Sequence, residues 1–236
     1  MKRKCITVLT GAGVSAESGV STFRDSDGLW ENHKVEDVAS IEGWYRNPSL
    51  VLDFYNQRRK QLADVRPNAA HLAIAGLEDE YKVIVVTQNV DNLHERAGST
   101  RIIHLHGELT KVRPENCCNE RDGFSEETVF DIGNDEIHMG DKAPNGAQLR
   151  PHIVWFGEAV PELSRGARAV EKADILIIIG TSLNVYPAAG LVHYAKKGCR
   201  IFLIDPAPMN LNIPNFQQIQ APATEGMRQL LEILDA

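Results

Sequence analysis

Short runs of apolar residues, separated by longer amphipathic stretches, recur along this chain. Five runs are rich in Ile and Val and end in polar or glycine residues, as strands buried on both faces of a parallel sheet do: Ile6–Leu9, Val83–Val86, Ile102–Leu105, Ile175–Ile179 and Ile201–Ile204. Helical patterns precede three of these runs, over Ala69–Leu77, Leu163–Lys172 and Ala188–Lys197. This alternation predicts an α/β protein built on a doubly wound, Rossmann-like parallel sheet.

Two segments interrupt the alternation. Residues 28–65 have a largely helical pattern, and residues 111–150 are polar and irregular. A structureless loop of that length is uncommon inside a compact domain, so we expect both segments to form a small subdomain. The prediction is a single domain, 1–236, with a Rossmann-like core at 1–27, 66–110 and 151–236 and a subdomain inserted at 28–65 and 111–150.

A glycine-rich run, Gly11–Gly19, directly follows the first predicted strand. Glycines at such a turn let the backbone approach a ligand closely, and a helix that begins there favours an anionic group. The spacing of Gly11, Gly13 and Ala16 also fits the dehydrogenase fingerprint. That fingerprint requires a second strand and an acidic residue roughly 20 positions on, whereas the chain continues as a polar segment with two large aromatics, Ser21–Trp30. The pattern therefore predicts a dinucleotide site but disfavours hydride transfer.

Composition narrows the possible partners and the compartment. The net charge of −7 disfavours a surface made for nucleic acid or anionic membranes. No apolar run approaches the roughly 18 residues of a membrane span, and the apolar stretch behind the basic N-terminus stops at Gly11, too early for a secretory signal. The cysteines imply no disulfide framework: Cys5, Cys117, Cys118 and Cys199. We expect a cytoplasmic protein.

Six motifs, in order along nearly the whole chain, resemble those of the sirtuins: Gly11–Gly19, Thr22–Arg24, Thr87–Asp91, His104–Leu109, Val154–Glu158 and Gly180–Ala189. The resemblance implies NAD-dependent removal of acyl groups from protein lysines. In that reaction nicotinamide is released and the acyl group passes to ADP-ribose. The implied cosubstrate is NAD, and the implied partners are acyl-lysine proteins or peptides.

The resemblance also implies catalytic roles. His106 would be the base that deprotonates a ribose hydroxyl, a task suited to a neutral imidazole because its ordinary pKa is about 6.5. Asn89 would order the ribose and the reacting water, and Asp91 would receive the nicotinamide carboxamide. His104 lies two residues before His106 on the same predicted strand, so it should point to the opposite face and be structural.

Further cofactor contacts are implied around the same strand ends. Phe23 would cover the nicotinamide pocket, and Arg24 would lie near the phosphates. Asp205 stands where the family commonly has Asn near the adenosine ribose, which leaves the contact plausible but altered. Glu17 is not expected to touch phosphate. The remaining implied contacts are Gly11, Ala12, Gly13, Ser15, Thr22, Gln88, Gly180, Thr181, Ser182 and Ala223.

A short β-like run after Pro151, Val154–Glu158, is the implied peptide-binding edge. In sirtuins this edge pairs with the substrate backbone, so the implied substrate contacts are Val154, Phe156 and Gly157. The alternative is an ordinary core strand that buries Trp155.

The helical pattern over 48–63 carries a cation in its apolar stripe. Arg58 lies at i+4 spacing with apolar neighbours: Leu50, Phe54 and Leu62. An inward guanidinium requires an anion, whereas Arg59 and Lys60 are expected to face solvent. With Tyr55, Arg58 resembles the Tyr-x-x-Arg pair of sirtuins that prefer acidic acyl groups such as succinyl. The alternatives are pairing with a neighbouring Asp or extension of Arg58 to solvent.

The metal motif departs from the family. Sirtuins usually hold a structural zinc with two cysteine pairs. Here the first pair is reduced to Pro114 and Cys117, and the second falls near 143–146, where no cysteine stands. Cys118, His138 and Asp141 remain an unconventional alternative, but their spacing matches no standard site. We therefore expect no zinc and no metal ligands.

Two other functions remain open. One is a module that binds NAD or ADP-ribose without turnover, and the other is transfer of ADP-ribose to protein. Intact Asn89, Asp91 and His106 favour an enzyme, because a binding module needs no base directed at ribose.

Overall fold

The computed structural model of the chain describes residues 3–21, 29–30, 33–116, 128–209 and 213–235. Five of the residues singled out above lie outside these ranges: Thr22, Phe23, Arg24, Cys117 and Cys118.

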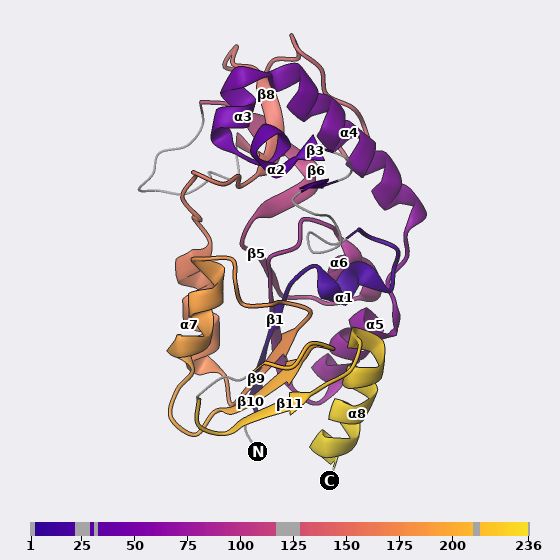
Figure 1. Ribbon diagram of the computed structural model, residues 1–236, viewed down its shortest axis with the longest axis vertical. Helices are drawn as coiled ribbons and strands as arrows, with labels where there is room; N and C mark the ends of the chain where they lie inside the picture. Colours follow the sequence, from indigo (N-terminus) through magenta and orange to yellow (C-terminus); the bar gives the residue numbers. More distant parts are fainter. Residues whose placement is uncertain (1–2, 22–28, 31–32, 117–127, 210–212, 236) are drawn as a thin grey trace.

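A six-stranded sheet with parallel pairing throughout forms the lower part of the molecule in Figure 1. Its order is β11-β10-β9-β1-β4-β5. The strands are β1 (Cys5–Thr10), β4 (Lys82–Thr87), β5 (Ile102–His104), β9 (Ile175–Ile179), β10 (Arg200–Ile204) and β11 (Phe216–Ile219). The predicted α/β fold with a doubly wound parallel sheet is confirmed.

All five predicted strands are present, and the sheet has a sixth that the pattern did not reveal. In β11, two glutamines separate the apolar end residues, and only Ile219 is fully buried. An edge strand has a single hydrogen-bonded neighbour and can expose one face, so it needs no continuous apolar run.

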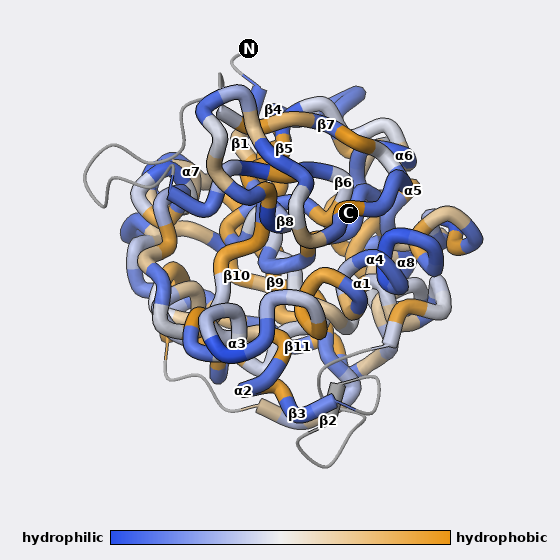
Figure 2. The backbone as a smooth tube through the Cα atoms, turned by 90° about the horizontal axis from the view of Figure 1, so that it is seen from above, coloured by the Kyte–Doolittle hydropathy of each residue, from blue (hydrophilic) through white to orange (hydrophobic). Residues whose placement is uncertain are grey.

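Helices cover both faces of this sheet. Helices α5 (Ala69–Gly76) and α8 (Ala223–Asp235) pack on one face, where Ile74 and Met227 join the core. Helix α7 (Leu163–Lys172) and the 3-10 helix η3 (Ala188–Tyr194) pack on the other. In Figure 2 the tube is largely orange at β9 and β10 near the centre of the view and bluer at α8 toward its edge. The predicted helix after Ala188 is thus shorter and 3-10 in type, because Gly190 and the β-branched Val192 weaken an α-helix.

A second, antiparallel sheet lies at the other end of the molecule. Its order is β7 (Phe130–Asp131), β6 (Gly107–Pro114) and β8 (Leu149–Ile153). The hairpin β2 (Leu29–Trp30) and β3 (His33–Lys34) and the helices α2 (Val35–Val38), α3 (Ile41–Arg46) and α4 (Pro48–Asp64) complete this end (Figure 1). The division of the chain into a core and a small subdomain at the limits given above stays our proposal.

Capping residues fix where helices α3 and α4 begin. Ser40 accepts a hydrogen bond from the Gly43 amide at 2.9 Å, and Asn47 accepts one from the Leu50 amide at 3.1 Å. Pro48 follows Asn47 as the first helical residue, where its missing N–H costs nothing. Starting α4 at Pro48 puts Tyr55 and seven other side chains of the helix in buried positions.

Candidate active site

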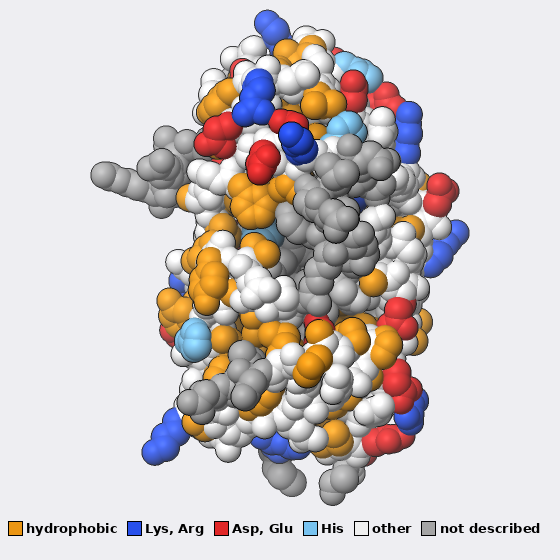
Figure 3. Space-filling view, in the orientation of Figure 1, with side chains coloured by type: hydrophobic (Ala, Val, Ile, Leu, Met, Phe, Trp, Pro, Cys, Tyr) orange, Lys and Arg blue, Asp and Glu red, His pale blue; other side chains and the backbone are white. Residues whose placement is uncertain are grey.

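A cavity of about 840 Å³ separates the two sheets at the carboxyl ends of β1, β4, β9 and β10. Hydrophobic side chains gather along this level of the face seen in Figure 3. The opening coincides with the point where strand order reverses around β1, as expected for ligand sites in open α/β sheets. Every predicted site residue within the described ranges lines it: Gly11, Ala12, Gly13, Ser15, Tyr55, Arg58, Gln88, Asn89, Asp91, His106, Val154, Phe156, Gly157, Gly180, Thr181, Ser182, Asp205 and Ala223.

Two glycine loops press against each other at the floor of the cavity. The Gly13 amide donates to the Gly180 carbonyl at 2.9 Å. Gly180 has a φ of +62°, and a Cβ there would lie 2.3 Å from the Val14 nitrogen. The glycines are therefore required by the contact between the loops themselves, besides any approach to a ligand. The helix that follows, α1 (Gly13–Ala16), is a single turn.

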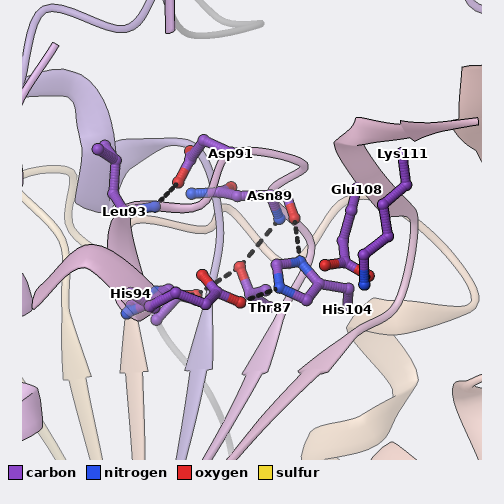
Figure 4. Close-up of polar contacts among 10 residues, drawn as sticks. Thr87, Asn89, Asp91, Leu93, His94, His104, Glu108 and Lys111 are labelled. Carbon is purple, nitrogen blue, oxygen red and sulfur yellow. Dashed lines mark hydrogen bonds and ion pairs between the residues drawn. The ribbon is translucent and has the colours of Figure 1, made fainter. Parts of the chain in front are cut away.

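Ser15 links the two polar side chains that follow β4. Asn89 Nδ2 donates to Ser15 Oγ at 3.1 Å, and Ser15 Oγ donates to Asp91 Oδ2 at 3.0 Å. The Leu93 amide donates to the other Asp91 oxygen at 3.1 Å (Figure 4). Burial raises the pKa of Asp91, and the hydrogen bonds from Leu93 and Ser15 oppose that rise. These bonds fix Asn89 and Asp91 side by side at the cavity wall.

Two buried histidines, one beside Ser15 and one beside Thr10, were not among the predicted site residues. His71 Nε2 lies 3.5 Å from Ser15 Oγ, and His94 Nε2 lies 3.2 Å from Thr10 Oγ1. Their ring centroids are 4.8 Å apart. Burial lowers the pKa of His71 to about 4 and that of His94 to about 3, so both rings are neutral near pH 7. In the sequence, this role of His71 is indicated by its place as a histidine within the apolar helical pattern of 69–77.

His106 lies just beyond β5 and lines the cavity. Its Nδ1 is 3.0 Å from the Gln88 carbonyl oxygen. A carbonyl only accepts, so Nδ1 holds the proton and Nε2 presents a lone pair. Burial lowers the pKa of His106. Gly107, with a φ of +83°, makes the turn into β6, where a Cβ would lie 2.0 Å from the His152 carbonyl oxygen.

His104 does not line this cavity. Its Nδ1 is 3.2 Å from the Asn89 carbonyl oxygen, and its Nε2 is 2.7 Å from Glu95 Oε1. Although burial opposes it, the hydrogen bond to Glu95 raises the pKa of His104.

The far end of the cavity is formed by the loops after β9 and β10. Gln88 Nε2 donates to Thr181 Oγ1 at 3.1 Å, which ties the β4 loop to the β9 loop. Asp205 is buried and accepts a hydrogen bond from the Ala207 amide at 2.9 Å. The Glu17 carboxylate accepts from both the amide and the hydroxyl of Thr224, at 2.9 and 2.7 Å, in the first turn of α8.

Tyr55 and Arg58 are buried on α4 and line the opposite end. Arg58 Cζ lies 6.0 Å from the centre of the Phe54 ring, as expected for an arginine in an apolar stripe. Trp155 Nε1 donates to the Tyr55 hydroxyl at 3.0 Å, so Tyr55 keeps its own phenolic proton as a potential donor. Burial raises the pKa of Tyr55, which holds it in the neutral form.

The prediction that Arg59 faces solvent is wrong. Its exposed fraction is 0%, its Nε donates to the Leu109 carbonyl at 2.8 Å, and its Nη1 donates to Asn56 Oδ1 at 2.6 Å. Burial lowers the pKa of Arg59 to about 10. Helix α4 also packs against β6, so more of the helix surface is buried than its single apolar stripe indicates. Lys60, in contrast, is 67% exposed and pairs with Glu136.

The predicted β-like run Val154–Glu158 is not a continuous strand, because β8 ends at Ile153 and Phe156 makes an isolated parallel β-bridge with Ser40. The Val154 amide donates to the His106 carbonyl at 2.9 Å, and the Phe156 amide donates to the Ala39 carbonyl at 2.9 Å. Trp155 is buried, as the alternative held, whereas Phe156 is 49% exposed at the cavity rim. The segment is thus a loop bonded to two neighbouring segments rather than an open strand.

Glu158 fixes this loop and was not predicted. It accepts from Arg150 Nη1 and Nη2 at 2.8 and 2.9 Å and from the Trp155 amide at 2.8 Å. Arg150 Cζ stacks 3.6 Å from the centre of the Trp155 ring. The only sequence signal was a carboxylate and a guanidinium flanking an apolar segment.

Of the expected zinc positions, the structure describes Pro114 and residues 143–146, none of which is a cysteine, whereas Cys117 lies outside the described residues. Around Ala143–Gly146 the backbone closes a turn, in which the Gly146 amide donates to the Ala143 carbonyl at 2.8 Å. Asp141 accepts from the His138 amide at 2.8 Å, while His138 Nε2 lies 3.2 Å from Glu136. Cys118, the third member of the alternative set, lies outside the described residues.

Because neutral histidines are buried in the folded chain, we expect the free energy of unfolding to fall in acid. His71, and His152 on β8, have pKa values of about 4 and about 3 in the folded chain, mainly because of burial. In the unfolded chain these histidines have a pKa of about 6.5, so their contribution is complete above that pH and is lost as the pH falls below it. We expect each to cost about 2 kcal/mol of unfolding free energy between pH 7 and pH 5.

Urea unfolding of the wild type and His152→Gln at both pH values measures this effect. The variant should lose about 2 kcal/mol less between pH 7 and pH 5. An equal loss in both proteins would show that His152 does not resist protonation in the folded state.

In the part of the chain that the structure describes, no helix is long and apolar enough to cross a membrane.

Comparisons with known proteins agree with this geometry. The chain is 55% identical over 234 residues to an NAD-dependent protein deacylase of Bacteroides thetaiotaomicron, covering 98% of each chain, and 53% identical over 229 residues to one of Helicobacter pylori, covering 97% and 96%. A solved Sir2 homologue in complex with NAD superposes with a TM-score of 0.84 at 40% identity, covering 99% of this chain and 90% of that one. A Sir2 complex with a p53 peptide and NAD+ superposes with a TM-score of 0.78 at 26% identity, covering 99% and 95%. The model of the Sir2 family matches residues 11–187, and this chain belongs to that family.

Proposed function

We propose that this protein is an NAD-dependent protein-lysine deacylase that transfers the acyl group to ADP-ribose and releases nicotinamide. The observation that carries the proposal is that Asn89, Asp91 and His106 all line the same cavity. The naming of the two relatives described above as NAD-dependent protein deacylases supports it.

The cavity suits NAD in size and in lining. Its volume of about 840 Å³ lies in the range of ligand pockets, and its floor consists of glycines whose missing Cβ atoms leave the backbone accessible. We assign the floor and the far end to NAD: Gly11, Ala12, Gly13, Ser15, Gln88, Gly180, Thr181, Ser182, Asp205 and Ala223. When bound, NAD supplies a ribose carbon that becomes electrophilic as nicotinamide leaves.

The side chains have separable tasks in this proposal. His106 Nε2 accepts the proton of a ribose hydroxyl, because Nδ1 is committed to the Gln88 carbonyl. Asp91 receives the nicotinamide carboxamide, and Asn89 orders the ribose and water. Ser15 holds both in place through bonds of 3.0 and 3.1 Å.

For the acyl group, we propose a preference for acidic acyl chains such as succinyl or malonyl, besides acetyl. Tyr55 and Arg58 line the same cavity as His106, at its opposite end from Asp205. A buried guanidinium beside a phenol that can donate is a recognised way to bind a carboxylate. We keep Val154, Phe156 and Gly157 as proposed contacts of the peptide, although two of their amides are already bonded within the chain.

One assay tests the proposal and its alternatives together. Purified protein is incubated with NAD and acetyl- or succinyl-lysine peptides, and free nicotinamide and deacylated peptide are measured. We expect both products in equal amounts. NAD binding without nicotinamide release would favour the binding module, and nicotinamide release with ADP-ribose on protein would favour ADP-ribosyl transfer.

We also propose that the small antiparallel sheet folds without a cysteine-bound zinc. Pro114 and the turn at 143–146 stand where ligands would be required. Treatment with a chelator should therefore leave the melting temperature unchanged, as measured by differential scanning fluorimetry with elemental analysis of the same sample. A stoichiometric zinc that resists the chelator, and whose removal unfolds the protein, would contradict this.

The free thiols of Cys5 and Cys199 suit a reducing compartment, and we propose a cytoplasmic location.

A further inference from the structure

Three potential metal ligands converge outside the cavity, behind the loop that carries Asn89. They are Glu95 on α6 (Leu93–Ala97), His104 at the end of β5 and Glu108 at the start of β6. One ligand atom from each lies within 4.8 Å of the others. Figure 4 shows the Glu108 carboxylate beside the His104 ring, on the side of that ring away from Asp91.

The His104 ring is already oriented as a metal ligand would be. Its Nδ1 lies 3.2 Å from the Asn89 carbonyl and its Nε2 lies 2.7 Å from Glu95 Oε1, and both oxygens only accept, so without a metal ion each ring nitrogen holds a proton. A metal ion would take the place of the Nε2 proton while Nδ1 kept its bond to Asn89. Histidines that bind metals characteristically donate their other ring N–H to a carbonyl or carboxylate. The His104 side chain is only 9% exposed, so its ring has little freedom to turn away.

The charges in the cluster favour a metal ion once the His104 Nε2 proton has left. Two carboxylates and one ammonium group face His104, because Lys111 Nζ lies 2.8 Å from Glu108 Oε2. With His104 protonated these four side chains carry no net charge, and loss of the His104 Nε2 proton leaves a net negative charge, which a divalent ion would reverse. Lys111 is a long, flexible side chain and competes with such an ion for Glu108.

The geometry requires only small movements. Two ligands of a tetrahedral zinc at about 2.1 Å are about 3.4 Å apart, so the most distant pair would close by roughly 1.4 Å. Glu95 is 39% exposed and Glu108 25%, and both can adjust their rotamers. Their exposure also leaves room for water as a further ligand.

We propose that Glu95, His104 and Glu108 bind a divalent first-row transition metal ion, with Zn²⁺ as the probe. An imidazole among the ligands favours such ions over Mg²⁺ or Ca²⁺, which prefer oxygen alone. This site lies on α6, β5 and β6, and none of its three ligands stands at a position of the family's cysteine pairs, 114–117 and 143–146. It shares only the Asn89 backbone with the proposed NAD site.

Isothermal titration of chelator-treated protein with Zn²⁺ tests the proposal. We expect one ion per chain. Co²⁺ should bind the same site and give visible d–d absorption without thiolate charge-transfer bands, because no cysteine takes part. Mg²⁺ at the same concentration should not compete.

Two substitutions that break the same ion pair should have opposite effects. Glu108→Gln removes a ligand and should weaken Zn²⁺ binding at least tenfold, whereas Lys111→Met removes the competing cation and should strengthen it severalfold. His104→Gln should weaken binding at least as much as Glu108→Gln. His138→Gln is the matched control, since His138 also pairs with a glutamate but belongs to no three-ligand cluster among the described residues, and it should change nothing.

Three results would overturn the proposal. They are no zinc binding by folded wild-type protein, equal affinity in the wild type and Glu108→Gln, and thiolate charge-transfer bands with Co²⁺. The melting temperature of each variant establishes that it is folded. If His104→Gln fails to fold, the opposed pair Glu108→Gln and Lys111→Met still decides the question.

Discussion

His106→Ala is expected to abolish deacylation while leaving NAD binding nearly unchanged. The imidazole is half-buried at the cavity wall, and its Nδ1 is held 3.0 Å from the Gln88 carbonyl, so only Nε2 can accept a proton from bound ribose. Removing a positioned general base typically costs 10²–10⁴-fold in rate. The substitution removes no side chain from the glycine floor, so affinity for NAD should persist.

Single-turnover deacylation and NAD titration calorimetry measure these two quantities separately. His193→Ala is the control, because His193 is exposed on η3 and does not line the cavity. Turnover of His106→Ala near the wild-type rate would rule out His106 as the base. Loss of NAD binding together with turnover would instead indicate that the substitution disturbs the cavity itself.

Arg58→Met is expected to cut desuccinylation by about 30-fold or more in kcat/KM while acetyl-lysine turnover stays the same or rises. Removing one partner of a buried charge pair typically costs about 2–5 kcal/mol, and the lower value corresponds to about 30-fold. Methionine preserves the volume of the arginine stem. Acetyl carries no carboxylate and gains nothing from the guanidinium.

Lys60→Met is the matched control on the same helix, because Lys60 is 67% exposed and bonds only at the surface with Glu136 among the contacts described. Arg59→Met cannot serve that purpose. Arg59 donates to the Leu109 carbonyl and to Asn56, so its loss should lower the free energy of unfolding instead. Equal losses on both substrates in Arg58→Met would mean that Arg58 is structural and that the enzyme is a general deacetylase.

Tyr55→Phe refines the test of the acyl pocket. It removes a potential donor to the acyl carboxylate and also the acceptor of the Trp155 indole N–H. We expect a smaller loss on succinyl than Arg58→Met produces, because a neutral hydrogen bond is weaker than one to a charged group. A loss confined to stability, with the ratio of the two activities unchanged, would restrict Tyr55 to a packing role.

The sequence by itself determined five of the six strands of the large sheet and the place of the site. Strands β1, β4, β9 and β10 are covered on both faces, and Ile102 and Ile103 of the edge strand β5 pack against the cores on the two faces, so each is a nearly continuous apolar run that is visible without a structure. Because parallel strands direct their carboxyl ends to one edge, motifs that follow different strands must meet there. That is why Gly11, Asn89 and Gly180, far apart in the chain, line one cavity.

Only the tertiary structure decided which polar side chains are buried and how the chain runs between motifs. Helical periodicity identifies one stripe, but α4 contacts a second element, which buries Arg59 as well as Arg58. The loop at 154–158 has the composition of a strand, yet its amides bond to His106 and Ala39, segments that the sequence does not place beside it. The contact between His71 and Ser15 and the cluster of Glu95, His104 and Glu108 also depend on how the chain folds. Hydrogen bonds join side chains that are close in space, and they leave no periodic pattern along the sequence.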